Sequence, residues 1–334
     1  MSDGECATGA ATPSMLVSIV NYRTGALVVD CLASLETEIA GMPGLRIIVI
    51  DNASGDDSCA RIEAAIVGNG WSGWAKLVRA PRNGGFAYGN NLAIAEAAKG
   101  LEAPELTWLL NPDTRVVPGA AAALASFMRR HPKAGIAGSG LLTAEGIPWP
   151  YAFRFPTILA EMERGLRLGI ATRLLRNHQL LRRMEDVTAP VDWVSGSSMV
   201  IRSAVFDGIG PMDEAYFLYF EETDFCQLAR RAGWECWYVP EAKVLHLAGA
   251  STGIIAGQPR IGRMPAYWFD SRRRYFVKNH GRLYAIGADI VWVVSHLLWR
   301  ARRRLQSRPD PDPPRLLRDF LARSVLWSDR PVVH

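Results

Sequence analysis

Cysteine patterns that bind metals or crosslink small domains are missing from this 334-residue sequence. Its five cysteines are scattered, with no CxxC pair among them. An odd, scattered set is typical of reduced thiols, so we expect a cytoplasmic protein. The first dozen residues also lack the basic stretch and the apolar core of a signal peptide. We therefore expect residues 1–13 to be a disordered start of the chain.

Two common phosphate-binding motifs are absent as well. The dinucleotide fingerprint GxGxxG belongs in the first turn between a strand and a helix, but that turn is NYRTGA, with a single glycine. The run GGFAYG at 84–89 has a different spacing and follows a later strand. No GxxxxGKS or GxxxxGKT sequence exists, which argues against kinase-like proteins and ATPases. A nucleotidyltransferase would need a basic glycine-rich loop near the first strand, and this loop is missing too.

Acidic residues are scarce in two stretches of a chain with a formal net charge of +5. Residues 161–183 contain six arginines against two glutamates, and residues 271–305 contain Lys278 and eight arginines against Asp289 alone. Because the excess is local, it predicts anionic partners for two patches rather than for the whole surface. A non-catalytic protein that binds nucleic acid or membrane would explain these arginines, but not the polar groups described next. We therefore expect no nucleic-acid partner.

Apolar runs alternate with helical patterns through the first 130 residues. Four short runs bounded by turns predict buried strands at 15–20, 46–50, 76–79 and 106–110. Strands that alternate with helices in this rhythm form a parallel sheet with helices on both faces. The sequence from Ser54 to Asp57 has the pattern of a capping box, so we expect a helix to begin there.

A polar residue follows each of these strands, namely Asn21, Asp51, Asn83 and Asp113. Ligands of parallel sheets bind at the carboxyl ends of the strands, so this arrangement predicts a binding site. Asp113 ends an Asn-Pro-Asp turn, from which a carboxylate can ligate a hard divalent cation. Taken alone, this tripeptide is more often an ordinary turn, and His246 on a later strand is more often a core histidine.

The stretch from Asp192 to Trp234 carries the strongest candidate for catalysis. Glu221, Glu222 and Asp224 stand where a helix is expected to begin, and carboxylates are favoured at that end of a helix. Taken alone, they would be helix-capping charges. Four aromatic residues between 216 and 220 precede them, which predicts a half-buried cluster. A carboxylate beside apolar rings has the raised pKa that a general base near neutral pH needs.

With these motifs together, the chain resembles the family 2 glycosyltransferases, in particular a bacterial rhamnosyltransferase-like branch. The resemblance covers roughly residues 15 to 280 and rests on several motifs in order. They are VSIVNYRTG, IIVIDNASGD, RNGGFAYGNN, LLNPDTRV, the stretch from Asp192 to Trp234, HLAGAST and RRRYFVKNHG. Each motif alone is weak, whereas their order and spacing are specific.

The resemblance implies a GT-A fold, that is, a Rossmann-like α/β fold with a mostly parallel central sheet flanked by helices. A glycosyltransferase domain would span 14–280 and be followed by an amphipathic helical extension with a tail at 281–334. Within the domain we expect three parts: a nucleotide-sugar-binding half at 14–130, a basic helical insertion at 155–183, and an acceptor and catalytic half at 190–250.

The resemblance also assigns the donor side of the site. The residues implied to bind a nucleotide sugar are Asn21, Tyr22, Asp51, Asn83, Gly84, Asn111 and Asp113. The Asn-Pro-Asp turn occupies the place of the family's DXD motif, with Asn111 in the position of the first acid. Metal binding, to Mg²⁺ or Mn²⁺, is therefore expected from Asp113, with His246 nearby.

The catalytic base is implied to lie at Glu222, because Glu221-Glu222 stands where the family usually has Glu-Asp. Glu222 is one methylene longer than that aspartate, which leaves Glu221 and Asp224 as competitors. The acceptor side would be formed by Trp193, Gly196, Asp213 and Glu214. The Trp193 ring offers a face to a sugar, although core packing is nearly as common a role for such a residue.

The reaction implied by the resemblance is a single inverting displacement at the anomeric carbon. The resemblance favours dTDP-rhamnose as the donor and a glycan or lipid-linked acceptor in bacterial cell-surface polysaccharide synthesis. Another UDP- or dTDP-sugar-dependent member of the family is the alternative.

Residues 283–299 are strongly apolar but include Asp289 and His296, and four arginines follow within 300–304. A helix that crosses a bilayer usually needs about 20 predominantly apolar residues, so spanning is marginal. An apolar helix bordered by arginines suits the headgroup region of an anionic membrane surface. We expect a peripheral position on the inner face of the plasma membrane. The alternative is a C-terminal helix docked on the catalytic domain.

Overall fold

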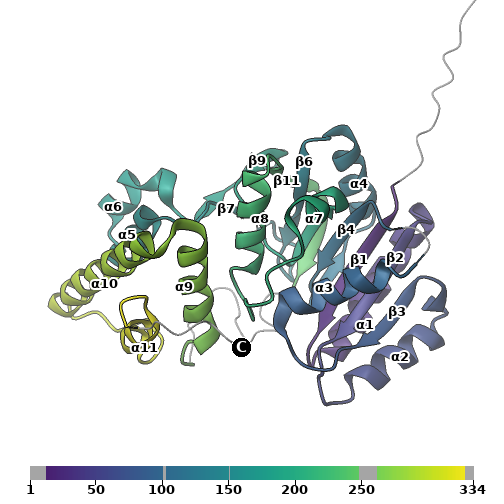
Figure 1. The fold of residues 1–334 in the computed structure, drawn as a ribbon, viewed down its shortest axis with the longest axis horizontal. Helices are drawn as coiled ribbons and strands as arrows, with labels where there is room; N and C mark the ends of the chain where they lie inside the picture. Colours follow the sequence, from purple (N-terminus) through teal and green to yellow (C-terminus); the bar gives the residue numbers. More distant parts are fainter. Residues whose placement is uncertain (1–12, 101–102, 150, 248–261, 328–334) are drawn as a thin grey trace, which may run out of the picture.

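The computed structural model of the protein describes residues 13–100, 103–149, 151–247 and 262–327. A twisted sheet and its covering helices form one side of the molecule, and a group of C-terminal helices lies beside them (Figure 1). Helices α8 (Glu221–Arg231) and α9 (Ala266–His280) lie at the junction of these two parts.

Nine strands form the main sheet of the described chain, and eight of them follow one path. Their order is β3 (Ala75–Arg79), β2 (Leu45–Asp51), β1 (Met15–Asn21), β4 (Leu106–Leu110), β10 (Ser198–Arg202), β6 (Ala134–Leu142), β11 (Glu235–His246) and β5 (Thr114–Val116), and β9 (Ala189–Val191) pairs with β11. Strands β1 to β4 pair in parallel, as do β6 and β11, whereas β10 is antiparallel to both of its neighbours. The predicted mostly parallel α/β fold is confirmed.

Helices cover both faces of this sheet because neighbouring strand residues point to opposite sides. Val17 and Ile19 of β1 pack in the core under α1 (Gly25–Gly41), α2 (Ser58–Gly68) and α4 (Ala120–Arg130). Leu16, between two residues of that core, instead packs on the opposite face with α3 (Gly85–Ala97). Helices α7 (Ser203–Ile209) and α8 share this second face, since Val205 and Phe225 pack with Met199 of β10.

The capping-box prediction at Ser54 is wrong. Helix α2 begins at Ser58. Its N-cap residue Asp57 forms no side-chain capping hydrogen bond, and the Ser58 N–H donates to Asp56 Oδ1 at 3.0 Å. The Ser54 hydroxyl instead donates to Asp51 Oδ1 at 2.5 Å and accepts from the backbone N–H of Arg23 at 2.9 Å. The prediction failed because the Ser54 hydroxyl is hydrogen-bonded to Asp51 and to the turn after β1, and so does not cap α2.

The basic insertion and the C-terminal residues pack against each other. Residues 155–183 contain α5 (Ile158–Leu166), α6 (Gly169–Leu174), a 3₁₀ turn at Arg176–His178 and β8 (Leu181–Arg183), which pairs with β7 (Tyr151–Phe153). Helix α5 lies along α10 (Arg282–Leu305) so closely that a Cβ on Gly165 would meet the Ser295 side chain at 2.6 Å. Helix α11 (Leu316–Arg323) closes this group against α9 and α10 (Figure 1).

A buried ion triad joins three of these helices. The Arg272 guanidinium of α9 lies 2.8 Å from a Glu161 oxygen of α5 and 2.6 Å from an Asp289 oxygen of α10. Burial alone would raise the pKa of Glu161, but Arg272 and Arg164 hold it below its ordinary value. Removing one member of such a buried group leaves an uncompensated charge, so the triad fixes how these helices pack.

Candidate active site

The turns after β1 and β2 are held together by buried polar side chains. Asn21 Nδ2 donates to Asp51 Oδ1 at 2.7 Å and to the Ser54 hydroxyl at 3.1 Å. The other carboxylate oxygen of Asp51 accepts from the Ser54 backbone N–H at 3.1 Å. Tyr22 is exposed on the same edge, with the Arg23 guanidinium 5.1 Å from its ring centre. The structure therefore brings three predicted donor residues to one strand edge.

The turn before α3 joins this edge through Asn52, a residue that the sequence patterns did not single out. Asn52 Nδ2 donates to Asn83 Oδ1 at 3.1 Å and to the Gly85 carbonyl at 3.0 Å. The backbone N–H of Gly84 approaches Asn52 Oδ1 at 3.5 Å. Asn52 directly follows Asp51 in the sequence, and that position after a buried strand is the signal that could have identified it.

The first turn of α3 contacts the segment that leads into the acidic cluster. The Phe86 backbone N–H donates to the Phe217 carbonyl at 3.1 Å. Gly85 has φ +87°, and a Cβ there would lie 1.9 Å from the Phe217 carbonyl oxygen. Only glycine permits this approach, because a side chain would be strained at that φ and would overlap the carbonyl. The donor edge and the acidic segment are thereby fixed against each other.

Asp113 and His246 are brought together by pairing of β5 with β11. Thr114 is opposite His246 in this ladder, and His246 Nε2 lies 3.4 Å from Asp113 Oδ1. Asp113 is buried, and its carbonyl accepts from the Leu247 backbone N–H at 2.9 Å. No group of three or more histidine, cysteine or acidic side chains suited to a metal occurs in the described part of the chain. A cation here would take further ligands from water or substrate.

Asn111 takes part in this turn through its backbone. Its N–H donates to the Ser197 carbonyl at 3.0 Å, and its carbonyl accepts from the Thr114 hydroxyl at 2.7 Å. These bonds attach the Asn-Pro-Asp turn to the start of β10. They place the turn beside residues 195–197. Gly196 of this segment lies next to Glu222 of α8.

Glu221 and Glu222 open α8 in a desolvated position. Burial raises the pKa of Glu221 well above its ordinary value, and the neighbouring charge of Glu222 raises it further. Burial also raises the pKa of Glu222, although backbone N–H groups, including those of Gly196 and Thr223, partly offset the rise. The Oε2 atoms of both have no hydrogen-bond partner among the described residues. Glu221 is buried, whereas Glu222 is partly exposed.

Asp224, in the same first turn of α8, has a different environment. Its two carboxylate oxygens each have a partner on α9, Lys278 Nζ at 2.6 Å and Asn279 Nδ2 at 2.6 Å. Lys278 also lies 2.7 Å from Asp213, which binds Arg274 at 2.7 Å. Lys278 and Asn279 belong to RRRYFVKNHG, one of the motifs that carried the resemblance, but no local pattern indicates what they contact.

The backbone directly before these acids is in a rare conformation. Tyr219 and Phe220 both have φ of 70°, and Phe220 is the residue directly before α8. A left-handed conformation of a non-glycine residue costs on the order of 1–3 kcal/mol and persists only where surrounding contacts enforce it. Phe220 packs against Tyr275 of α9 at a ring-centre distance of 5.6 Å, which is one such contact.

Of the four residues predicted on the acceptor side, Gly196 lies nearest to the acids. A Cβ on Gly196 would be 3.8 Å from the Glu222 Cβ and 3.0 Å from the Phe86 ring. Trp193 is buried, stacks on Phe153 at 4.1 Å and donates from Nε1 to the Arg154 carbonyl at 2.9 Å. Glu214 accepts from Asn91 at 2.9 Å, and Asp213 holds the two cations of α9.

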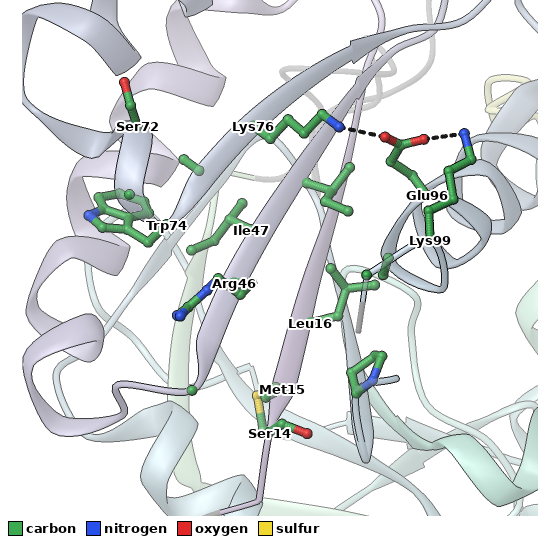
Figure 2. Close-up of a pocket in the computed structure, with 17 residues that line it drawn as sticks. Ser14, Met15, Leu16, Arg46, Ile47, Ser72, Trp74, Lys76, Glu96 and Lys99 are labelled. Carbon is green, nitrogen blue, oxygen red and sulfur yellow. Dashed lines mark hydrogen bonds and ion pairs between the residues drawn. The ribbon is translucent and has the colours of Figure 1, made fainter. Parts of the chain in front are cut away.

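A cavity of about 490 Å³ lies at the opposite end of the strands (Figure 2). Met15, Ile47 and Ala75 line it near the beginnings of β1, β2 and β3, whereas Asn21 and Asp51 end their strands. The Lys76–Glu96–Lys99 group at its border is ion-paired within itself. This cavity is therefore separate from the candidate active site.

The fold and these residues suit an enzyme that binds its substrate at the carboxyl ends of the strands, and comparison with known proteins defines the class. Residues 13–260 match the family described as "Glycosyltransferase like family 2". The chain belongs to this family and is a glycosyltransferase, as the sequence motifs predicted. Similar solved structures include a mannosyltransferase from Pyrobaculum calidifontis in complex with GDP-Man and Mn²⁺. That likeness has a TM-score of 0.55 and 12% identity, and it covers 89% of this chain and 76% of that one. It confirms the GT-A fold.

Two curated relatives are also glycosyltransferases. The N-acetylglucosaminyl-diphospho-decaprenol L-rhamnosyltransferase of Mycobacterium tuberculosis is 29% identical over 254 residues, which cover 72% of this chain and 78% of the relative. The low-salt glycan biosynthesis hexosyltransferase Agl10 of Haloferax volcanii is 28% identical over 218 residues, covering 64% of this chain and 61% of the relative.

Proposed function

We propose that this glycosyltransferase moves L-rhamnose, from dTDP-rhamnose, to a hydroxyl of a glycan or lipid-linked acceptor with inversion at the anomeric carbon. The observation that carries the proposal is the position of Glu222. This carboxylate has a raised pKa and an oxygen without a hydrogen-bond partner in the described structure. It opens a helix whose preceding segment is bonded to the donor edge at Phe86.

Glu222 is the best candidate for the base among the three acids. Asp224 has both oxygens bound to α9, so it positions α8 rather than accepting a proton. Glu221 is buried, and its own charge is disfavoured by that of Glu222. Glu222 is partly exposed and lies beside Gly196, so its carboxylate is the most accessible of the three acids.

The reaction is one displacement. The acceptor oxygen forms a bond to the anomeric carbon while the bond from this carbon to the diphosphate oxygen breaks. Glu222 takes the proton of the acceptor hydroxyl, and the nucleoside diphosphate leaves with the electron pair. A base with a pKa raised toward neutral is matched to this transfer.

Asp113 and His246 fit a divalent cation. A carboxylate oxygen and an imidazole nitrogen 3.4 Å apart form a donor pair suited to Mn²⁺, and Mg²⁺ would rely more on the carboxylate. Such a cation supplies positive charge that stabilises the departing diphosphate. Asp113 and His246 would hold it at the edge of the sheet, where β4 and β11 end.

On the donor side, the exposed Tyr22 ring suits stacking against a base, and Asp51 Oδ2 retains capacity to accept from a ribose hydroxyl. The preference for rhamnose and for a lipid diphosphate acceptor is supported by the name of the mycobacterial relative. Such an acceptor would place the enzyme on the cytoplasmic face of the membrane. Another dTDP- or UDP-sugar is the alternative donor.

A donor screen tests this function. Release of nucleoside diphosphate is measured with Mn²⁺ or Mg²⁺, a set of dTDP- and UDP-sugars, and a polyprenyl-diphosphate glycan acceptor. We expect acceptor-dependent release of dTDP from dTDP-rhamnose above all other donors. Release from a UDP-sugar alone would overturn the donor assignment, and donor turnover that is independent of any acceptor would overturn the transfer.

A further inference from the structure

Helix α10 has two faces of unlike kind, although its sequence looks apolar throughout. One face is buried against α5, α9 and α11 and includes Asp289, Trp292, His296 and Trp299. Asp289 binds Arg272 and accepts from the Val325 backbone N–H at 2.8 Å, and His296 lies 3.4 Å from Asp312. The two polar residues that interrupt the apolar run therefore point inward.

The opposite face of α10 exposes a continuous apolar stripe. Its most accessible members between the helix ends are Ile290 (47% exposed), Val294 (51%), Leu297 (48%) and Leu298 (58%). Spacings of three, four and seven residues place them on one side of the helix. No charged residue falls on this stripe between Leu283 and Arg300. Nothing in the described structure covers it, whereas a soluble surface rarely exposes such a continuous row.

A cationic cavity lies at the C-terminal end of this stripe. It has a volume of about 640 Å³ between α10 and α11, and its lining includes Arg300, Arg315 and Arg318 together with Leu317 and Leu321. Arg300 is three residues from Leu297, so the cavity mouth adjoins the stripe. The side chains of these three arginines form no ion pair or hydrogen bond within the described structure.

The acids of the same cavity are already ion-paired. Asp310 lies 2.9 Å from Arg303, and Asp312 lies 2.9 Å from Arg167 and 3.4 Å from His296. The three arginines therefore lack a direct ion pair beside the leucine side chains, and the nearby Asp319, which interacts with Arg315 and Arg318, is itself bound by Arg263 at 2.6 Å. A mixed lining of guanidinium groups and leucines suits a molecule that carries a phosphate on an apolar chain.

We propose that the stripe of α10 lies in the headgroup region of a bilayer and that the cavity between α10 and α11 binds the phosphate of an anionic phospholipid. This inference rests on the proposed function, because a lipid-linked acceptor requires the enzyme to reach a membrane. No helix in the described ranges combines the length and hydropathy needed to cross a bilayer.

Charge complementarity favours a bilayer over a second copy of the chain. In a symmetric dimer the same patch lies on both sides of the interface. The patch offers three arginines without an ion pair, whereas the acids around them, Asp310, Asp312 and Asp319, are already paired. An anionic leaflet supplies both an apolar layer for the stripe and phosphates for the guanidinium groups. Each arginine near such a surface contributes roughly a fivefold gain in binding.

The test is flotation of the full-length protein with vesicles of phosphatidylcholine, with or without phosphatidylglycerol. We expect binding mainly to the phosphatidylglycerol vesicles. Combined substitution Arg300→Gln, Arg315→Gln and Arg318→Gln should reduce that binding at least ~10-fold. The matched control is Arg129→Gln, Arg130→Gln and Lys133→Gln, which removes three charges near α4, at the far end of the molecule (Figure 1). Equal losses of vesicle binding in both variants would show that only the net charge of the protein matters. That result would refute the proposed phosphate site in the cavity.

The stripe is tested by Ile290→Asn, Val294→Asn and Leu298→Asn. Its control is Val67→Asn, Ile147→Asn and Val187→Asn, which alters three exposed apolar residues elsewhere. The first variant should lose vesicle binding and the second should keep it. Analytical ultracentrifugation then tests whether a second copy of the chain covers the stripe instead. If the unaltered protein is a dimer, and the stripe variant alone is a monomer that still binds vesicles, the partner is a second copy. If excess soluble glycerol phosphate releases the protein from the vesicles, the ligand of the cavity is a free phosphate compound rather than a phospholipid.

Vesicle binding needs neither donor nor acceptor, so its outcome does not depend on the transfer reaction. Donor binding measured by calorimetry should be the same in all four variants, since none of the substituted residues lies near the candidate active site. An enzyme that binds vesicles as expected but transfers no rhamnose would refute the proposed function alone.

Discussion

Lys278 Nζ lies 2.6 Å from Asp224 Oδ2, and this contact fastens helix α9 to the first turn of the helix that carries the proposed base. Asp224 is buried and Lys278 is 31% exposed, so the pair is only partly screened by solvent. The same lysine reaches Asp213, which holds the other side of the loop leading into α8. The pair therefore positions Glu222 without touching it.

Substitution Lys278→Met should lower the free energy of unfolding by about 1–3 kcal/mol, because it leaves the buried Asp224 carboxylate with Asn279 alone. Lys76→Met is the matched control, since Lys76 is 61% exposed and solvent screens its pair with Glu96, so this change should have a clearly smaller effect. Urea unfolding followed by circular dichroism measures both. Equal losses in the two variants would remove the structural role of the Lys278–Asp224 pair.

Gly85 tests the contact between the donor edge and the acidic segment. We expect Gly85→Ala to reduce turnover at least ~10-fold, because the new Cβ would displace the Phe217 carbonyl and shift the path into α8. Gly119→Ala is the control: its φ is also positive, at +91°, but its Cβ would meet nothing within 4 Å. That change should cost about 1–2 kcal/mol of stability and leave turnover nearly unchanged. Steady-state kinetics and thermal unfolding distinguish the two effects.

Asp113 and His246 should differ in their effects on metal-dependent donor binding. Asp113→Ala should abolish this binding, since the carboxylate supplies the charge that holds the cation. His246→Ala should weaken it less, because one neutral ligand is lost while the carboxylate stays. Calorimetry with dTDP-rhamnose, Mn²⁺ and then excess chelator measures the binding. Donor affinity that chelator leaves unchanged in the unaltered enzyme would refute the metal site.

Glu221 gives a prediction about stability and pH. Its folded-state pKa is raised above the value in the unfolded chain, so the stability it contributes is present below the unfolded pKa and is lost as pH rises through the folded pKa. Glu221→Gln keeps the neutral form at every pH. This variant should therefore unfold at a higher temperature than the unaltered protein at pH 8, and the difference should shrink toward pH 4. A lower melting temperature at pH 8 would contradict the raised pKa.

Local sequence patterns predicted the parallel half of the fold well. The apolar runs at 15–20, 46–50, 76–79 and 106–110 lie within β1, β2, β3 and β4. Each run is short and bounded by a turn, so its burial is decided by residues close in the chain. For the same reason the order of strands and turns was enough to place the polar residues after β1, β2 and β4 at one edge of the sheet.

Features that depend on distant residues could not be predicted in this way. Asp289 looked like an interruption of an apolar helix, but its partner Arg272 is on another helix and the third member, Glu161, is 111 residues from that arginine. The sequence suggested that the Trp193 ring could face a sugar. In the structure this ring stacks on Phe153. The roles of Lys278 and Asn279 likewise depend on how α9 packs on α8.

The most direct test of the account is the turnover of Glu222→Gln, measured with saturating donor and acceptor beside donor affinity by calorimetry. Glutamine keeps the shape of the side chain but cannot take a proton, so turnover should fall at least ~10²-fold while donor affinity stays nearly constant. In the unaltered enzyme, kcat/KM should decline as pH falls through the raised pKa of this carboxyl. Asp224→Asn, by contrast, should lose stability more than turnover. Near-normal turnover of Glu222→Gln, together with loss of turnover in a folded Asp224→Asn, would transfer the base to Asp224 and contradict the mechanism.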